Sequence, residues 1–129
     1  MVDSIERLRA AILVARTRDP AVSRTARLVA EGMPKMAKKL AEEAIEVGLE
    51  AMQNDRGRVI LESADLIYNL AVLWSQIGVS PDEVWREMDR REALFGIAEK
   101  LPKTRATPQA AASGTPDIAA RAPAALRAG

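Results

Sequence analysis

The chain has 129 residues, with 19 basic and 18 acidic side chains and a net charge of +1, which argues against a partner bound through nucleic-acid phosphates. Hydrophobic residues make up 48% of it but aromatic residues only 3%, a composition typical of helices packed through aliphatic side chains. It contains no cysteine and no histidine, so disulfides, thiolate nucleophiles and histidine general bases are excluded. We therefore expect an all-α protein whose chemistry relies on carboxylates, amines, guanidinium groups or hydroxyls.

The first part of the chain predicts two helices separated by a loop. Apolar residues recur at helical spacing over residues 4–16, which indicates an amphipathic helix. Ser23 is a good helix cap and predicts a shorter helix over residues 24–30. Gly32 and Pro34 are expected to stop that helix and to form a loop beside a functional site.

Three longer helices are predicted in the middle of the chain. Residues 35–52 are rich in Ala, Leu, Glu and Lys and predict a helix that ends in a turn over residues 54–57. A second helix is expected over residues 58–76. Residues 80–83 then have the sequence of a capping box with proline at the first helical position, which predicts a helix ending near Phe95.

The composition changes sharply near residue 101. Beyond that point the chain is mainly Ala, Pro, Thr, Arg and Gly, which cannot bury enough apolar surface to offset the entropy lost on folding. We therefore expect one helical domain over residues 1–100 and a flexible tail over residues 101–129. No apolar run reaches the roughly 20 residues needed to span a membrane, and early charges interrupt any signal-peptide core, so we expect a cytoplasmic protein with no membrane partner.

The helix expected over residues 58–76 is apolar on nearly every side. Such a helix must be covered all round, and a chain with so few helices has little with which to cover it. The simplest solution is a four-helix core made of two helix pairs from two subunits. We therefore predict a homodimer or a higher homo-oligomer.

Five carboxylates stand out within these apolar helices. Glu42, Glu43 and Glu46 share adjoining rows of one helix, and Glu62 and Asp65 share a row of the next. If the two helices pack antiparallel, Glu43 and Glu46 approach Glu62 and Asp65. Several carboxylates facing one another in a low-dielectric interior need a compensating cation, so the pattern indicates a metal site.

The chemistry of this site follows from its ligands. Carboxylate oxygens without His or Cys suit Mg²⁺, with Mn²⁺ as a possibility, and Mg²⁺ commonly binds substrate phosphates. Hydrolysis of a nucleotide polyphosphate fits best. The alternative is a solvated acidic face paired with Lys38 and Lys39, although this does not explain the acids within the apolar second helix. Among the basic residues before the acidic motif, Lys35 is favoured as a phosphate ligand.

The acidic pattern also carries a family resemblance. Residues 39–46 and 62–68 resemble the EExxE and ExxD motifs of the all-α nucleoside triphosphate pyrophosphohydrolases, the MazG-like superfamily. The similarity extends over roughly residues 20 to 95 and is greatest to the phosphoribosyl-ATP pyrophosphohydrolase family. It implies Mg²⁺-dependent cleavage of phosphoribosyl-ATP to phosphoribosyl-AMP and pyrophosphate, a step of histidine biosynthesis.

The resemblance also implies roles for individual residues. Glu43, Glu46, Glu62 and Asp65 would be the metal ligands, and Glu42 would join Glu43 and Glu46 as a catalytic acid or a supporting group. The expected substrate-binding residues are Lys35, Lys39 and Asn69. Lys39 would contact phosphate, but it is equally placed to pair with Glu43 one helical turn away.

The sequence departs from the family pattern at several positions. Asn69 stands where these enzymes usually carry His, Arg24 replaces an aromatic residue, and Pro34 precedes the motif helix. These changes bear on the substrate more than on the metal, because the acids are intact. Two alternatives therefore stay open: a MazG-like housecleaning hydrolase of other nucleoside triphosphates, and a helical dimerisation module without catalytic activity.

Overall fold

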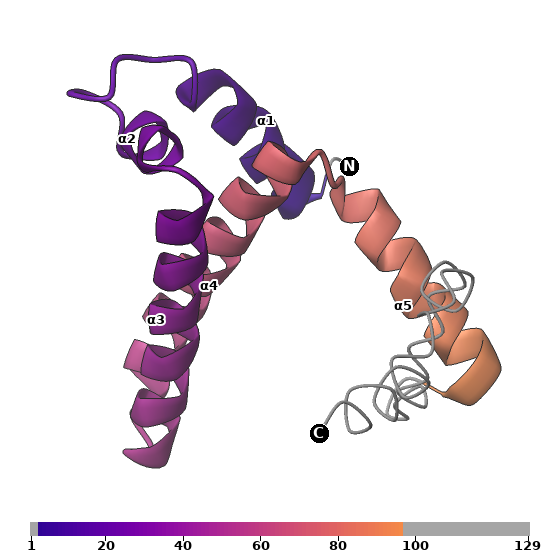
Figure 1. The fold of residues 1–129 in the computed structure, drawn as a ribbon. Coiled ribbons are helices and arrows are strands. Elements are labelled where there is room, and N and C mark those ends of the chain that lie inside the picture. Colours follow the sequence, from indigo (N-terminus) through magenta and orange to yellow (C-terminus); the bar gives the residue numbers. More distant parts are fainter. Residues whose placement is uncertain (1–2, 97–129) are drawn as a thin grey trace, which may run out of the picture.

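The computed structural model describes residues 3–96, and this part of the chain consists of five α-helices without strands (Figure 1). The expected tail over residues 101–129 lies outside the described residues, as does the end of the predicted domain. The all-α prediction is confirmed. The helices are α1 (Ser4–Ala15), α2 (Arg24–Glu31), α3 (Met33–Met52), α4 (Arg56–Ile77) and α5 (Pro81–Phe95).

Local sequence signals account for most helix ends. The Ser23 hydroxyl accepts a hydrogen bond from the Ala26 N–H and caps α2. Gly78 ends α4 with φ of 83°, a left-handed conformation that favours glycine. At the start of α5, Ser80 and Glu83 form the predicted capping box. Each of these side chains or glycines satisfies backbone groups that a helix end would leave unpaired.

Two predicted helix boundaries were wrong by two residues. Helix α3 begins at Met33 and includes Pro34 in its first turn, where the missing proline N–H would have had no helical partner. The sharp corner before it is made by Gly32, whose φ is 91°. Helix α4 begins at Arg56 because the Asp55 carboxylate caps it by accepting from the Arg58 N–H at 3.0 Å. The turn between α3 and α4 is therefore shorter than expected.

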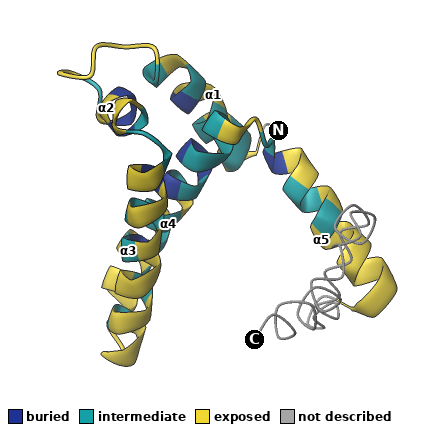
Figure 2. Cartoon of the chain, viewed as in Figure 1, coloured by how far each residue is buried: buried dark blue, intermediate teal, exposed yellow. Residues whose placement is uncertain are grey.

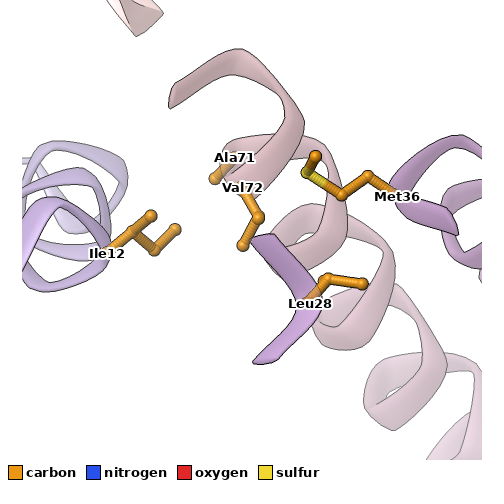
Figure 3. Close-up of a cluster of buried hydrophobic side chains, with 5 residues drawn as sticks. All are labelled: Ile12, Leu28, Met36, Ala71 and Val72. Atoms are coloured by element: carbon orange, nitrogen blue, oxygen red, sulfur yellow. The ribbon is translucent and has the colours of Figure 1, made fainter. Parts of the chain in front are cut away.

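Helices α3 and α4 pack along each other as a long antiparallel hairpin, the most extensive helix contact in the described chain (Figure 1). Helices α1 and α2 cover only one end of this hairpin. The buried apolar side chains gather at that end, where all four helices meet (Figure 3), and they are Ile12, Leu28, Met36, Ala71 and Val72. The core thus fixes α2 against the hairpin and leaves the far end of α3 and α4 largely exposed (Figure 2).

Helix α5 extends away from the other helices (Figure 1). Its clearest link to the hairpin is an edge-to-face contact between Trp74 and Trp85, whose ring centroids are 6.5 Å apart. This edge-to-face arrangement is one that aromatic pairs favour. Within residues 3–96 no helix is long and apolar enough to cross a lipid bilayer.

Candidate active site

Three carboxylates meet between the two long helices. Glu43 of α3 and Glu62 and Asp65 of α4 each place one oxygen so that all three oxygens lie within 4.8 Å of one another. Glu43 is 5% exposed and the other two are partly buried. The antiparallel hairpin therefore brings the two acidic motifs together, as their spacing indicated. We call Glu43, Glu62 and Asp65 the acidic cluster.

Two cations partly balance the acidic cluster. The Lys39 Nζ atom lies 3.4 Å from Glu43 Oε1 and 3.2 Å from Glu42 Oε2. Its hydrogen bond to Glu42 raises the pKa of Lys39, so the side chain stays protonated at neutral pH. On the other side, an Arg24 guanidinium nitrogen lies 4.0 Å from Asp65 Oδ1. The predicted pairing of Lys39 with Glu43 is present, and its contact with phosphate stays a prediction.

The donor set of the acidic cluster fits one hard divalent cation. Oxygens on opposite sides of a Mg²⁺ ion are about 4.2 Å apart, twice the usual Mg–O distance, and Ca²⁺ allows somewhat more. The oxygens of the acidic cluster lie close to this range without any rearrangement of the backbone. Three oxygen donors from two helices would leave other coordination positions for water or phosphate, which is the arrangement that Mg²⁺ favours in nucleotide enzymes.

The other two acids of the motif lie differently. Glu46 is exposed and is outside the acidic cluster, so its predicted role as a metal ligand has no support from the geometry and stays a prediction. Glu42 contacts two cations of its own helix, Lys38 at 3.9 Å and Lys39 at 3.2 Å. In that position Glu42 orients Lys39 between two carboxylates, in keeping with the supporting role expected of it.

A basic pocket of about 140 Å³ lies next to the acidic cluster. It connects to the cluster through Lys39, which contacts Glu43, and through Arg24, which contacts Asp65. We call this cavity the basic pocket, and it is lined by Arg24, Arg27, Leu28, Glu31, Lys35, Lys39 and Asn69. The three residues expected to bind substrate, Lys35, Lys39 and Asn69, are thus brought together.

Sequence reasoning gave too little weight to Arg24 and Arg27. Both belong to the short helix α2, and their charges could equally have formed a solvated face. The Arg24 guanidinium lies 5.0 Å from the centroid of the Tyr68 ring, and the hydroxyls of Thr25 and Tyr68 are 2.6 Å apart. These contacts hold α2 against α4 and turn its arginines toward the site. The signal in the sequence was the spacing of Arg24 and Arg27, three residues apart on one helical face.

The chain is similar in sequence to known proteins of one family. A sequence model of the phosphoribosyl-ATP pyrophosphohydrolase family matches residues 5–92. The chain is 59% identical over 123 residues to phosphoribosyl-ATP pyrophosphatase 2 of Bradyrhizobium diazoefficiens, covering 95% of this chain and 90% of the relative. It is 61% identical over 115 residues to the protein of the same name from Rhodopseudomonas palustris, covering 89% and 88%.

A third relative, the phosphoribosyl-ATP pyrophosphatase of Granulibacter bethesdensis, is 45% identical over 117 residues, which cover 91% of this chain and 73% of the relative. The all-helical fold and the family match make this chain an all-α nucleotide pyrophosphohydrolase. The chain belongs to the phosphoribosyl-ATP pyrophosphohydrolase family. The family resemblance seen in the acidic motifs is thereby confirmed.

Proposed function

We propose that this protein hydrolyses phosphoribosyl-ATP to phosphoribosyl-AMP and pyrophosphate, as a step of histidine biosynthesis. The observation that carries the proposal is the acidic cluster lying directly beside a pocket lined by four cations, in a chain of this family. A polyphosphate needs both features, because its negative oxygens attract the cations while a metal ion joins it to the carboxylates.

The acidic cluster would hold the divalent cation, for which we propose Mg²⁺, with Mn²⁺ as a substitute. When bound, the ion would neutralise charge on the phosphates and make a coordinated water more acidic. The carboxylates of Glu43, Glu62 and Asp65 would hold it between α3 and α4. Glu46 and Glu42 are proposed as further acids of the same site, Glu42 through its contact with Lys39.

The basic pocket would bind the polyphosphate. Lys39 and Arg24 already contact carboxylates, so both bridge the acidic cluster and the pocket. Arg27 and Lys35 line the pocket from α2 and α3, and no ion pair links either one to an acid in the described part of the chain. These two charges are therefore available to phosphate oxygens without first breaking a contact.

We also propose that the protein is a homodimer, with two α3–α4 hairpins forming a four-helix core. Helix α3 exposes Ile45, Leu49 and Met52 at the spacing of a single helical stripe, and α4 exposes Ile60, Leu61 and Ile67. Within residues 3–96 these side chains are 44% to 84% exposed, and Figure 2 shows that the far end of the α3–α4 hairpin is largely exposed. A second copy would bury both stripes by the same helix packing that forms the hairpin.

The direct experiment measures pyrophosphate release by the purified protein from phosphoribosyl-ATP, ATP and a panel of other nucleoside triphosphates, with and without Mg²⁺. The proposal predicts Mg²⁺-dependent release with the highest kcat/KM for phosphoribosyl-ATP. A higher kcat/KM for a free nucleoside triphosphate would instead support the housecleaning alternative. No release from any substrate would support the dimerisation module without catalytic activity.

The proposed cytoplasmic location stays a prediction.

A further inference from the structure

Asn69 carries a buried polar atom that the described structure leaves without a partner. The side chain is 1% exposed, and its amide nitrogen donates a hydrogen bond to the Asp65 backbone carbonyl at 2.9 Å. Its Oδ1 atom accepts none and is the one buried side-chain nitrogen or oxygen in residues 3–96 that lacks a hydrogen bond. An unmade hydrogen bond at such a site costs about 1–3 kcal/mol, so an acceptor here calls for an explanation.

The orientation of the amide follows from its surroundings. A backbone carbonyl only accepts hydrogen bonds, so the side-chain nitrogen must be the atom that faces Asp65. The Oδ1 atom is therefore directed elsewhere, and Asn69 lines the basic pocket. One helical turn separates Asn69 from Asp65, so the part of the pocket wall that Asn69 forms lies next to the acidic cluster.

The chemistry of the acceptor narrows what it binds. Ionised phosphate oxygens carry no hydrogen at neutral pH and would be repelled by a carbonyl oxygen. A second divalent cation is disfavoured in a pocket whose lining includes Arg24, Arg27, Lys35 and Lys39. The partner of Oδ1 must therefore donate a hydrogen bond and carry no positive charge. A neutral hydroxyl or amino group of a bound nucleotide does both.

We propose that Asn69 Oδ1 accepts a hydrogen bond from a hydroxyl or amino group of the substrate and so recognises its nucleoside part, while the cations bind its phosphates. The inference rests on the proposed function and deepens it. One part of the basic pocket would bind the charged phosphates, and another part would bind a neutral hydrogen-bond donor. A site built around such an acceptor discriminates strongly against a substrate without the donor.

The test combines substrate analogues with variants. Three analogues of phosphoribosyl-ATP each lack one hydrogen-bond donor of the nucleoside part. The first lacks the 2′-hydroxyl and the second the 3′-hydroxyl of the ribose that carries the triphosphate. In the third, the exocyclic nitrogen of the base is replaced by oxygen. For the wild-type protein, one analogue should lose about tenfold or more in kcat/KM. In Asn69→Leu, which is similar in size but has no acceptor, the parent substrate and that analogue should react equally, and the identity of the analogue separates the sugar from the base.

Two further variants keep the result interpretable. Asn69→Ala removes the acceptor without adding bulk and carries the test if Asn69→Leu does not fold. Gln76→Leu removes an amide from the same helix outside the basic pocket and should keep the wild-type discrimination. A merely structural role for Asn69 would lower stability or turnover for all substrates alike, leaving the discrimination intact, and would overturn the proposal. So would a wild-type protein that does not discriminate among the analogues.

Failure of the proposed function would be recognisable separately. If the wild-type protein releases no pyrophosphate from phosphoribosyl-ATP, the proposed reaction is wrong. The dissociation constants of the same nucleotides, measured calorimetrically for the wild type and Asn69→Ala, then test the proposed hydrogen bond to Asn69. A loss of affinity for one analogue in the wild type alone supports this hydrogen bond. The same pattern of affinities in both proteins overturns it.

Discussion

The hydroxyl groups of Thr25 and Tyr68 lie 2.6 Å apart and join the short helix α2 to the motif helix α4. Thr25 is buried, and the Arg24 guanidinium stacks over the Tyr68 ring. Tyr68 follows Asp65 by three residues, so the same turn of α4 both presents a carboxylate to the acidic cluster and anchors the helix that carries the arginines. The position of the basic pocket next to the acidic cluster depends on this contact.

Replacing Tyr68 with Phe should remove this hydrogen bond and keep the ring. Because the Thr25 hydroxyl is buried and loses its partner, we expect the free energy of unfolding to fall by about 1 kcal/mol. Urea unfolding of Tyr68→Phe, Thr25→Val and the double variant measures the coupling. The double variant should be less destabilised than the sum of the single ones, and full additivity would contradict a direct interaction.

Glu43 is the most buried member of the acidic cluster, and its replacement by Gln should abolish turnover. We expect kcat/KM to fall by at least about 100-fold, because even groups that support a metal ligand are commonly worth 10 to 100-fold. The melting temperature without metal should be unchanged or higher, since one of three crowded negative charges is removed. Unchanged turnover would rule out Glu43 as a ligand.

The matched control for Glu43→Gln is Glu50→Gln. Glu50 lies on the same helix and pairs with Arg58 at 3.4 Å, outside the acidic cluster. This change should leave kcat and KM unchanged. A similar loss of turnover in both variants would indicate a general effect of charge on α3 rather than metal binding.

Lys35 lines the basic pocket but contacts no acid of the cluster, so it is expected to bind phosphate in ground state and transition state alike. Lys35→Gln should therefore raise KM by roughly five- to tenfold, a modest effect because the side chain is exposed, and leave kcat unchanged. Steady-state kinetics with phosphoribosyl-ATP measure both. Lys38→Gln, three residues further along and outside the basic pocket, should change neither, and equal effects of the two variants would contradict a specific role for Lys35.

The proposed dimer predicts that a charge placed on the exposed stripe of α4 separates the subunits. Leu61 is 65% exposed in the single chain, and Leu61→Lys should convert a dimer into a monomer in sedimentation velocity measurements. Val22 is 82% exposed in the loop before α2, so Val22→Lys should leave the dimer intact. A wild-type protein that sediments as a monomer would refute the four-helix core.

Much of the fold followed from local signals in the sequence. Ser23 and the Ser80–Glu83 capping box marked the starts of α2 and α5 because each satisfies backbone groups within a few residues. The start of α3 was misplaced because Pro34 disfavours a helix interior but not a first turn. At the start of α4, Asp55 could have been recognised as a cap, but the following Gly57 made a longer turn the simpler interpretation.

The candidate site was predictable only where helical periodicity determines it. The spacing of Glu62 and Asp65, with Glu43 on the facing helix, was enough to predict a cluster across an antiparallel hairpin. The exposed position of Glu46 could not be predicted from the spacing, because the rotation of α3 about its axis is set by tertiary packing. The role of α2 was also hidden, since its contact with Tyr68 joins residues 43 positions apart in the chain.

The central claim is that Glu43, Glu62 and Asp65 together bind a divalent cation. The most direct measurement is calorimetric titration of Mg²⁺, repeated with Mn²⁺, into the wild-type protein and the Glu62→Gln/Asp65→Asn double variant. We predict saturable binding by the wild type and none by the double variant, with folding of both confirmed by circular dichroism. Equal uptake by the two proteins, or no uptake by the wild type, would contradict the account.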